Sequence, residues 1–297
     1  MYYLLEANNK LAAEIKGEKY EEPADSSNPF TDVSADAYYH DAVLWALDKN
    51  VTTGTSKTTF SPSATCTRGQ AVTFLWRAAG EPVQYILGEW DFMGRDFTVG
   101  PGVLIPRPET EQLTEAAIDY LRKRPECRVL ELCGGSGCIA ITVAKTLPAA
   151  NVTVLELSPE AMEYLRANMA RHKTDNVTAV QGDALCPPPT IQGPYDAILS
   201  NPPYIASGEL PTLQREVRRE PAMALDGGTD GLDVYRGFND IYPRMLAPGG
   251  LLLYEIGEEQ GEAVAALLRN AGLERVAILR DVYGHPRNVL GYAPDEN

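Results

Sequence analysis

The second half of the chain alternates short apolar runs with amphipathic helical patterns, and this alternation constrains the fold more than any other feature. Strands that alternate with helices form a parallel sheet that is covered on both faces. We therefore predict an α/β fold with a mostly parallel seven-stranded sheet, its strands at residues 128–132, 151–157, 177–181, 195–200, 251–256, 275–279 and 289–292. Helices are expected between the strands, notably over 138–147, 231–246 and 260–271.

A glycine-rich turn, Cys133–Gly137, follows the first of these strands. It brings backbone without bulky side chains to the carboxyl end of a strand, where α/β folds bind ligands. The glycines alone leave a structural turn and a dinucleotide loop equally open, but the G-x-G-x-x-G spacing of dinucleotide folds is absent. Glu156 closes the next strand, where a carboxylate can accept both hydroxyls of a ribose. Together these features indicate a nucleoside pocket.

The sequence Asn201-Pro202-Pro203-Tyr204, directly after an apolar strand, is the most informative motif. Prolines cannot donate backbone hydrogen bonds or continue a central strand, so the turn exposes acceptors at the carboxyl edge of the sheet. An amide nitrogen is a poor nucleophile because its lone pair is delocalised into the carbonyl group. We expect Asn201 Oδ1 and the Pro202 carbonyl each to accept one N–H of an acceptor amide, which directs the lone pair at a methyl group. Tyr204 is expected to pack against the flat acceptor.

The first part of the chain has a different organisation. Residues 1–29 run into a polar, proline-punctuated linker with at most a short helix. Residues 36–50 place apolar side chains at spacings of three and four, and Thr67-Arg68-Gly69-Gln70 fits a capping box at the start of a second helix that ends at Gly80. We therefore expect a linker over 1–29, a small helical module over 30–80 and an α/β domain over 81–297.

Charge and composition narrow the class of partner. A net charge of −15 repels phosphate backbones and anionic lipid, so nucleic acid and membrane are not expected as direct partners. The amino terminus lacks the pattern of a secretory signal, and no apolar run approaches the roughly 20 residues that span a bilayer. We therefore expect a cytoplasmic protein. The 5 cysteines form no C-x-x-C pair and the 3 histidines have no metal-ligand spacing, so neither disulfides nor a metal site are predicted.

Residues 30–80 resemble a single S-layer homology module. The resemblance rests on Phe30-Thr31-Asp32-Val33, Thr59-Phe60-Ser61-Pro62 and Trp76-Arg77-Ala78-Ala79-Gly80, with matching residues between them. Such modules usually occur in tandem on exported proteins and bind cell-wall polymers. A single copy without an export signal is expected to serve as a borrowed scaffold rather than to bind wall polymer.

From residue 81 onward the chain resembles the peptide chain release factor glutamine N5-methyltransferases. The matches include Gly80-Glu81-Pro82-Val83-Gln84-Tyr85, Val103-Leu104-Ile105-Pro106-Arg107-Pro108-Glu109-Thr110-Glu111, the glycine-rich turn and Asn201-Pro202-Pro203-Tyr204-Ile205. The resemblance implies a class I Rossmann-like methyltransferase fold and S-adenosylmethionine as the methyl donor. It also implies that the acceptor is the glutamine of a Gly-Gly-Gln loop in release factors, which would be the protein partner.

The resemblance also implies roles for individual residues. Those expected to contact the cofactor are Cys133, Gly134, Gly135, Ser136, Gly137, Glu156, Asp183, Ala184 and Asn201. Those expected to hold the acceptor glutamine are Asn201, Pro202, Pro203, Tyr204, Arg107 and Glu109, with Asn201, Pro202 and Tyr204 catalytic. For the segment from Arg107 to Glu111, walling the pocket and merely starting the next helix are equally open.

Two departures from the family pattern stand out. The turn reads Cys-Gly-Gly-Ser-Gly where Gly-Thr-Gly-Ser-Gly is commoner, and Glu131 and Glu156 replace the usual aspartates. Size or charge is kept, so cofactor binding is still expected. The family's own amino-terminal helical domain, which helps to dock the release factor, is replaced by the S-layer-like module, which indicates a fusion near Gly80-Glu81-Pro82.

Four alternatives remain open from the sequence. A glutamine methyltransferase for a ribosomal protein would look the same at the pocket, and a chimera that binds cofactor could have weak activity. A DNA adenine-N6 methyltransferase also uses an Asn-Pro-Pro-Tyr turn, but a chain this acidic lacks the cationic groove that base flipping needs. A wall-polymer binding protein would have to be exported, and the sequence has no signal for that.

Overall fold

The computed structural model describes residues 28–295, apart from positions 38, 49–50, 68–69, 72, 75–80 and 125. The described residues do not include Asn50 and Gly80, where the two helices of the first part are predicted to end. They include only the last two residues of the predicted linker. The chain divides into two compact units, Met1–Leu87 and Gly88–Asn297, and each has a hydrophobic core of its own. Over the part of the chain that the structure describes, no helix is both long enough and apolar enough to cross a membrane.

The first unit packs around a small cluster of Phe30, Val33 and Val43. Val43 comes from α2 (His40–Asp48), within the segment predicted to be helical. The ring of Phe30 lies 5.7 Å from that of Phe60, which extends the cluster. Another short helix, α4 (Val83–Leu87), also belongs to this unit.

Hydrogen bonds between side chains and backbone groups stabilise the loops of the first unit. The Asp32 carboxylate accepts the N–H groups of Phe60 (2.8 Å) and Ser61 (2.7 Å), and these bonds hold the pKa of Asp32 below its usual value. The predicted capping box is confirmed, because Thr67 N–H donates to Gln70 Oε1 (2.9 Å) while Gln70 N–H donates to Thr67 Oγ1 (3.2 Å). The segment therefore has the local bonding that its sequence specifies.

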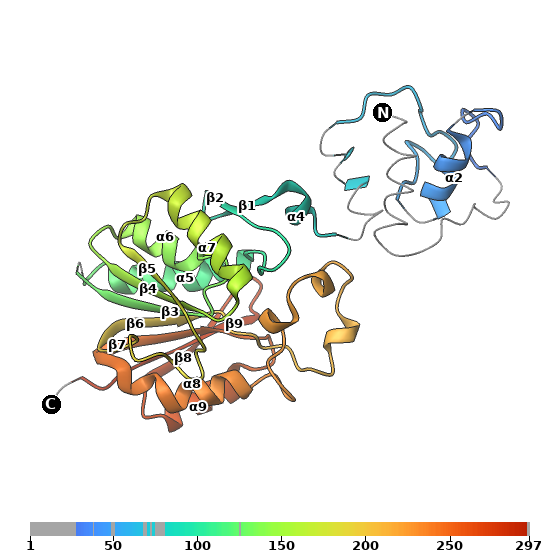
Figure 1. Cartoon of the computed structure of the whole chain (residues 1–297). Helices are drawn as coiled ribbons and strands as arrows, with labels where there is room; N and C mark the ends of the chain where they lie inside the picture. Colours follow the sequence, from blue (N-terminus) through green and yellow to red (C-terminus); the bar gives the residue numbers. More distant parts are fainter. Residues whose placement is uncertain are drawn as a thin grey trace. The chain divides into compact units, whose positions relative to one another are not determined.

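The second unit is built on a seven-stranded sheet with the strand order β5-β4-β3-β6-β7-β9-β8 (Figure 1). Neighbouring strands from β5 to β7 run parallel, whereas β9 pairs antiparallel with β7 and β8. The strands are β3 (Arg128–Leu132), β4 (Asn151–Glu156), β5 (Val177–Gln181), β6 (Tyr195–Ser200), β7 (Leu246–Glu255), β8 (Glu274–Arg280) and β9 (Pro286–Tyr292). The predicted α/β fold with a mostly parallel sheet is confirmed.

Helices cover both faces of this sheet, as the alternation in the sequence predicts (Figure 1). On one face lie α5 (Pro108–Leu121), α6 (Cys138–Thr146) and α7 (Pro159–His172), and on the other lie α8 (Asp233–Ile241) and α9 (Gly261–Asn270). Ser158 caps α7, since its side chain accepts the N–H of Ala161 at 3.1 Å, and Pro159 occupies the first turn. The helix expected between β4 and β5 therefore begins at Pro159.

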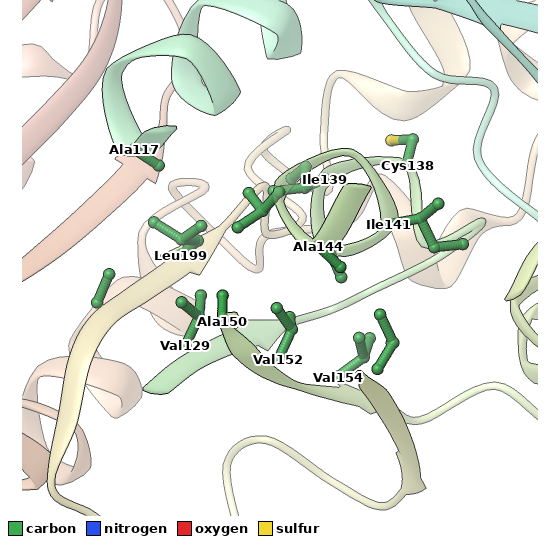
Figure 2. Packing of buried hydrophobic residues seen from close by; sticks show 14 of the residues in the cluster. Ala117, Val129, Cys138, Ile139, Ile141, Ala144, Ala150, Val152, Val154 and Leu199 are labelled. Carbon is green, nitrogen blue, oxygen red and sulfur yellow. The ribbon is translucent and has the colours of Figure 1, made fainter. Parts of the chain in front are cut away.

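The strands bury both of their faces, which explains their continuous apolar character. Successive residues of β3 point to opposite sides, so Val129 joins the core beneath α5–α7 while Leu130 joins the core beneath α8 and α9. Figure 2 shows side chains of β3, β4, β6 and α6 packed together in the first of these cores. This packing fixes the carboxyl ends of the strands, where the loops of the site begin.

Proline explains why one predicted helix is shorter than expected. The pattern over 231–246 predicts a single helix, but α8 ends at Ile241 and Pro243–Met245 forms a 3-10 turn. Pro243 has no N–H to continue the helical bonds. The next strand, β7, begins at Leu246, whereas the sequence predicts a start at residue 251. Gly249 and Gly250 belong to this strand.

A hairpin near the start of the second unit was not predicted, and a helix starting between Arg107 and Glu111 was one of the two roles that the sequence left open for that segment. The hairpin pairs β1 (Glu89–Phe92) with β2 (Arg95–Thr98) through Met93 and Gly94, both of which have positive φ values of 52° and 72°. Only Phe92 and Phe97 of its strands are fully buried, so the alternation of apolar residues is weak. The helix is α5, which follows Arg107 directly. Short 3-10 helices at Leu210–Thr212, Val217–Arg219 and Ala222–Ala224 follow β6.

Candidate active site

A cavity of about 470 Å³ lies at the carboxyl ends of β3, β4, β5 and β6. This is the edge of a parallel sheet at which α/β proteins bind ligands. Four of the residues that line it carry carboxyl groups, namely Glu131, Glu156, Glu160 and Asp183. A second, smaller cavity of about 190 Å³ shares Leu104, Arg107, Asn201 and Ala224 with the first. The arrangement provides two neighbouring spaces, one acidic and one beside the Asn-Pro-Pro-Tyr turn.

The glycine-rich turn forms one wall of the larger cavity. A Cβ atom on Gly134 would lie 2.1 Å from Val154 Cγ1, so only glycine lets the turn lie against β4. Gly135 has a φ of 55°, and a Cβ there would meet nothing closer than 4.0 Å, since it faces the open cavity. Cys133 has a φ of 58°, an uncommon value for a residue with a side chain. The backbone of the turn is therefore shaped for close approach of a ligand.

Glu156 holds the turn and the next helix together. Its Oε2 accepts the N–H of Gly135 at 2.7 Å, and its Oε1 accepts the N–H of Ser158 at 2.7 Å. The side chain is buried but still lines the cavity. Each carboxylate oxygen has a further lone pair, so the group can accept hydrogen bonds from the hydroxyl groups of a ligand while it keeps both bonds to backbone N–H groups.

Glu131 is a second buried carboxyl group beside this wall. It is 1% exposed, and its Oε2 accepts the N–H of Ala140 at 2.9 Å. Burial raises the pKa of Glu131 to about 8, because a carboxylate loses hydration there, and the charge of Glu156 acts in the same direction. The acidic wall therefore holds one carboxyl group that is largely protonated at neutral pH.

Asp183 and Ala184 follow β5 and close the far side of the cavity. Asp183 Oδ1 accepts the N–H of Leu185 at 2.7 Å, which fixes the turn, and the Ala184 carbonyl accepts the hydroxyl of Tyr242 at 2.7 Å. Leu185 is half exposed at the rim. An aspartate and an apolar rim at this place are suited to a flat heteroaromatic ring with an amino group.

The Asn-Pro-Pro-Tyr turn lies between the two cavities. Ser200, the last residue of β6, donates to the Leu132 carbonyl at 2.9 Å and so fixes the strand end next to β3. Asn201 lines both cavities, and its Nδ2 donates to Thr110 Oγ1 at 3.1 Å. This bond uses the amino side of the carboxamide and leaves the carbonyl side for a bound molecule.

Tyr204 is held by hydrogen bonds at its backbone carbonyl and at its hydroxyl. Gln260 Nε2 donates to its backbone carbonyl at 2.8 Å, and its hydroxyl donates to Glu255 Oε1 at 3.4 Å. Burial raises the pKa of Tyr204, and the charge of Glu255 adds to the effect. The ring lines the smaller cavity. It is therefore a fixed, neutral wall against which a planar group can pack.

Arg107 is the residue before α5 and also lines both cavities. Its guanidinium forms an ion pair with Glu220, a side chain that is 5% exposed and also accepts the Ile105 N–H at 3.0 Å. The segment from Arg107 to Glu111 thus does both things that the sequence left open: it lines the pocket and starts a helix. Glu109 is exposed and lines neither cavity.

The structure brings together most, but not all, of the residues expected at the site. Those that line the larger cavity are Cys133, Gly134, Gly135, Ser136, Glu156, Asp183, Ala184, Asn201, Pro203 and Arg107. Tyr204 lines the smaller one, whereas Gly137, Pro202 and Glu109 line neither. Gly137 instead caps α6 with a φ of 79°, and a Cβ there would lie 2.3 Å from Leu165 Cδ1. The packing of α6 against α7 therefore requires glycine at position 137.

Sequence reasoning missed Thr110, Glu220 and Glu255, and it mentioned Glu131 only as a departure from the family. Glu255 is the more instructive omission. It ends the apolar run of β7 as Glu156 ends that of β4, so the same signal could have found it. Glu220 lies in an irregular segment without a strand or helix pattern, and no local signal marks it.

Comparisons with known proteins agree with this geometry. The methyltransferase small domain family matches residues 100–228, and the S-layer homology domain matches residues 29–72. A release factor glutamine methyltransferase from Moorella thermoacetica is 42% identical over 222 residues, which cover 74% of this chain and 78% of the relative. One from Geobacter sulfurreducens is 44% identical over 217 residues, or 72% of this chain and 74% of the relative.

The chain belongs to the release factor glutamine methyltransferase family. Among solved structures, a methyltransferase from Pyrococcus furiosus superposes with a TM-score of 0.50 at 18% identity and covers 68% of this chain and 90% of its own. That likeness supports the methyltransferase fold. The enzyme uses S-adenosylmethionine as its methyl donor, as members of this family do.

The cavity of this methyltransferase fits S-adenosylmethionine on its own chemistry. The ligand carries ribose hydroxyls, an adenine amino group and a positive sulfonium but no phosphate, and the lining offers carboxylates rather than a lysine loop. When bound, S-adenosylmethionine supplies an electrophilic methyl group. The residues of the lining that would hold it are Cys133, Gly134, Gly135, Ser136, Glu156, Asp183 and Asn201.

Proposed function

We propose that this methyltransferase transfers a methyl group to the side-chain amide nitrogen of the glutamine in the Gly-Gly-Gln loop of peptide chain release factors. The names of the relatives from Moorella thermoacetica and Geobacter sulfurreducens support this acceptor. The observation that carries the proposal is the position of Asn201 at the boundary of the two cavities, with its amino group already bonded to Thr110.

Asn201 and Pro202 are proposed to orient the acceptor. Asn201 Oδ1 would accept one N–H of the glutamine amide, which turns its nitrogen lone pair toward the larger cavity. The Pro202 carbonyl is proposed to accept the other N–H, although Pro202 lines neither cavity and this bond would form only with the acceptor in place. A near-attack separation of about 3 to 3.5 Å then lets orientation supply much of the rate. No dedicated base is required, because the methylated amide nitrogen is strongly acidic and loses its proton to solvent.

Tyr204 and Arg107 are proposed to complete the acceptor subsite. The neutral Tyr204 ring packs on one face of the planar amide and excludes water. Arg107, held by Glu220, lines both cavities and is placed to bind a backbone carbonyl of the acceptor loop. Because a planar guanidinium donates in a fixed fork, this pair can select the direction from which the loop enters.

The division of the chain is proposed to be a linker over 1–29, an S-layer homology-like module over 30–80 and a catalytic domain over 81–297. The match of the S-layer homology domain to residues 29–72 supports the second of these. The acceptor glutamine belongs to the translation machinery, so we propose that the enzyme acts in the cytoplasm and that its module does not bind wall polymer.

Methyl transfer from labelled S-adenosylmethionine to purified release factor tests the function. We expect label on the intact release factor and none on a release factor whose Gly-Gly-Gln glutamine is changed to alanine. Purified ribosomal proteins provide the comparison for another protein acceptor. Label on a ribosomal protein with none on release factor would contradict the proposed acceptor.

A further inference from the structure

A chain of buried hydrogen bonds runs behind the Asn-Pro-Pro-Tyr turn. Asn201 Nδ2 donates to Thr110 Oγ1 at 3.1 Å, and Thr110 Oγ1 donates to Glu255 Oε2 at 2.6 Å. Tyr204 donates its hydroxyl to the other carboxylate oxygen, Oε1, at 3.4 Å. Thr110 and Glu255 are each 2% exposed.

Proton counting fixes the direction of these bonds. A carboxylate can only accept, so the single proton of the Thr110 hydroxyl is directed at Glu255. The hydroxyl therefore presents a lone pair to Asn201, so Asn201 must donate to it from its amino group. The carboxamide oxygen then faces the cavities, as an acceptor for amide N–H groups requires.

We propose that Thr110 and Glu255 are positioning residues that set the orientation of the Asn201 carboxamide, and that protonation of Glu255 removes this control. The proposal deepens the proposed function, because it concerns how the same site binds the glutamine amide. Neither residue touches the acceptor in this role. They act through Asn201.

The surroundings of Glu255 allow its charge to change near neutral pH. Burial raises the pKa of Glu255 to about 7, the hydrogen bonds from Thr110 and Tyr204 oppose the shift, and the charges of Glu109 and Arg107 act in opposite directions. The other titratable groups that sense this charge are Tyr235 of α8 and Cys138 of α6. The Tyr235 hydroxyl donates to the Glu255 backbone carbonyl at 2.7 Å, so it does not compete for the carboxylate.

Protonation of Glu255 reverses the bonding. A neutral Glu255 can donate to Thr110 Oγ1, whose own proton is then free to turn toward Asn201. A donating hydroxyl favours Asn201 Oδ1, so the carboxamide rotates and presents its amino group to the cavities. An amino group cannot accept the N–H of a glutamine amide, and the acceptor is no longer oriented.

Three threonine variants test this role through the rate. Thr110→Val keeps the shape but removes both bonds, Thr110→Ser keeps the hydroxyl, and Thr114→Val is the matched control. Thr114 is buried on the same helix but donates only to the Thr110 backbone carbonyl, at 3.0 Å. We expect Thr110→Val to lower kcat at least tenfold at pH 8, by a larger factor than any change in the Kd for S-adenosylmethionine, since Thr110 also lines the larger cavity. Thr110→Ser and Thr114→Val should stay within about threefold of the wild type.

The pH profile separates positioning from a loss of packing. The wild-type kcat should rise with a midpoint near pH 7 as Glu255 ionises, and the Thr110→Val profile should lack this step. A Thr110→Val enzyme with a wild-type kcat, or one that keeps the wild-type step, would overturn the proposal.

A measurement without acceptor distinguishes this inference from the proposed function. In protein labelled with ¹⁵N-asparagine, the side-chain NH₂ signal of Asn201 is assigned by its loss in Asn201→Ala. We expect this signal to shift with a midpoint near pH 7 in the wild type and not in Thr110→Val. A signal that titrates in an enzyme inactive on release factor supports the positioning role and rejects the acceptor. Methylation of release factor by an enzyme whose signal does not titrate rejects the positioning role.

Discussion

Individual residues at this site are controlled by burial more than by their sequence neighbours. Glu131 is the penultimate residue of β3 and Glu156 is the last residue of β4. The pKa of Glu131 is raised to about 8, while Glu156 accepts two backbone N–H groups. Desolvation raises the pKa of Glu131, whereas hydrogen bonds fix the position of the Glu156 carboxylate. The sequence presents both simply as glutamates at strand ends.

Asn201→Ala should remove the orientation of the acceptor without removing the cofactor pocket. We expect kcat to fall by about 10²- to 10³-fold, because positioning carries most of the catalysis, while S-adenosylmethionine still binds. Asn151→Ala is the matched control, since Asn151 is exposed at the opposite end of β4. Single-turnover methyl transfer and calorimetric binding check the two effects. Equal losses in kcat and cofactor affinity would argue against an orienting role.

Glu131→Gln should change how stability depends on pH. The folded pKa of about 8 lies above the usual 4.5, so the folded state binds more protons than the unfolded state between these values. The free energy of unfolding therefore falls as pH rises from about 4.5 to 8. Glutamine cannot ionise, so the variant should lack this fall and be more stable than the wild type at pH 8.5, by at least ~1 kcal/mol.

Urea denaturation between pH 5 and 8.5 measures this difference. Glu163→Gln, a substitution at an exposed position of α7, should keep the wild-type slope. A Glu131→Gln protein with the same slope as the wild type would show that Glu131 is ionised in the folded state at low cost.

At the scale of elements, the glycine-rich turn and β4 constrain each other. A Cβ on Gly134 would lie 2.1 Å from Val154 Cγ1, a side chain that is fully buried. The elements can come this close only because one residue lacks a side chain. The alternation of apolar residues predicted the strand and the turn separately, but not their distance.

Gly134→Ala should destabilise the protein by about 1–3 kcal/mol and weaken cofactor binding, because overpacking forces the turn away from β4. Val154→Ala alone leaves a cavity and should also destabilise it. The double variant should be less destabilised than the sum of the two, since the smaller side chain at 154 makes room for the new methyl group. Chemical denaturation of the four proteins measures the coupling, and strictly additive losses would contradict the contact.

At the scale of the whole molecule, the second unit contains the entire site. All residues that line the two cavities lie between residues 102 and 238, within the unit Gly88–Asn297. Both large cores also draw only on residues of that unit. The first unit has its own small core.

A protein that begins at Gly88 should therefore fold and bind S-adenosylmethionine with a Kd within about threefold of the full chain. Circular dichroism, thermal unfolding and calorimetry check this expectation. Comparing kcat/KM for release factor between the two proteins then shows whether residues 1–87 contribute to acceptor recognition. An insoluble or unfolded fragment would contradict the independence of the second unit.

The sequence by itself determined the α/β alternation, the seven strands, the glycine-rich turn and the Asn-Pro-Pro-Tyr motif. These are local patterns, because periodicity, turn chemistry and residue spacing act within a few residues along the chain. It also placed the residues at the carboxyl edge of the sheet, since parallel strands bring their ends together. The length of α8 and the start of β7 were wrong, and the β1–β2 hairpin was not predicted. Of the expected site residues, Gly137, Pro202 and Glu109 line neither cavity.

Only the tertiary structure decided which side chains meet across the chain. Thr110 lies 91 residues from Asn201 and 145 residues from Glu255 along the chain, yet the three side chains form one hydrogen-bonded set. The pairing of Arg107 with Glu220 and the protonation of Glu131 arise in the same way. Hydrogen-bond partners and desolvation are properties of the packed interior, so no local pattern in the sequence can specify them.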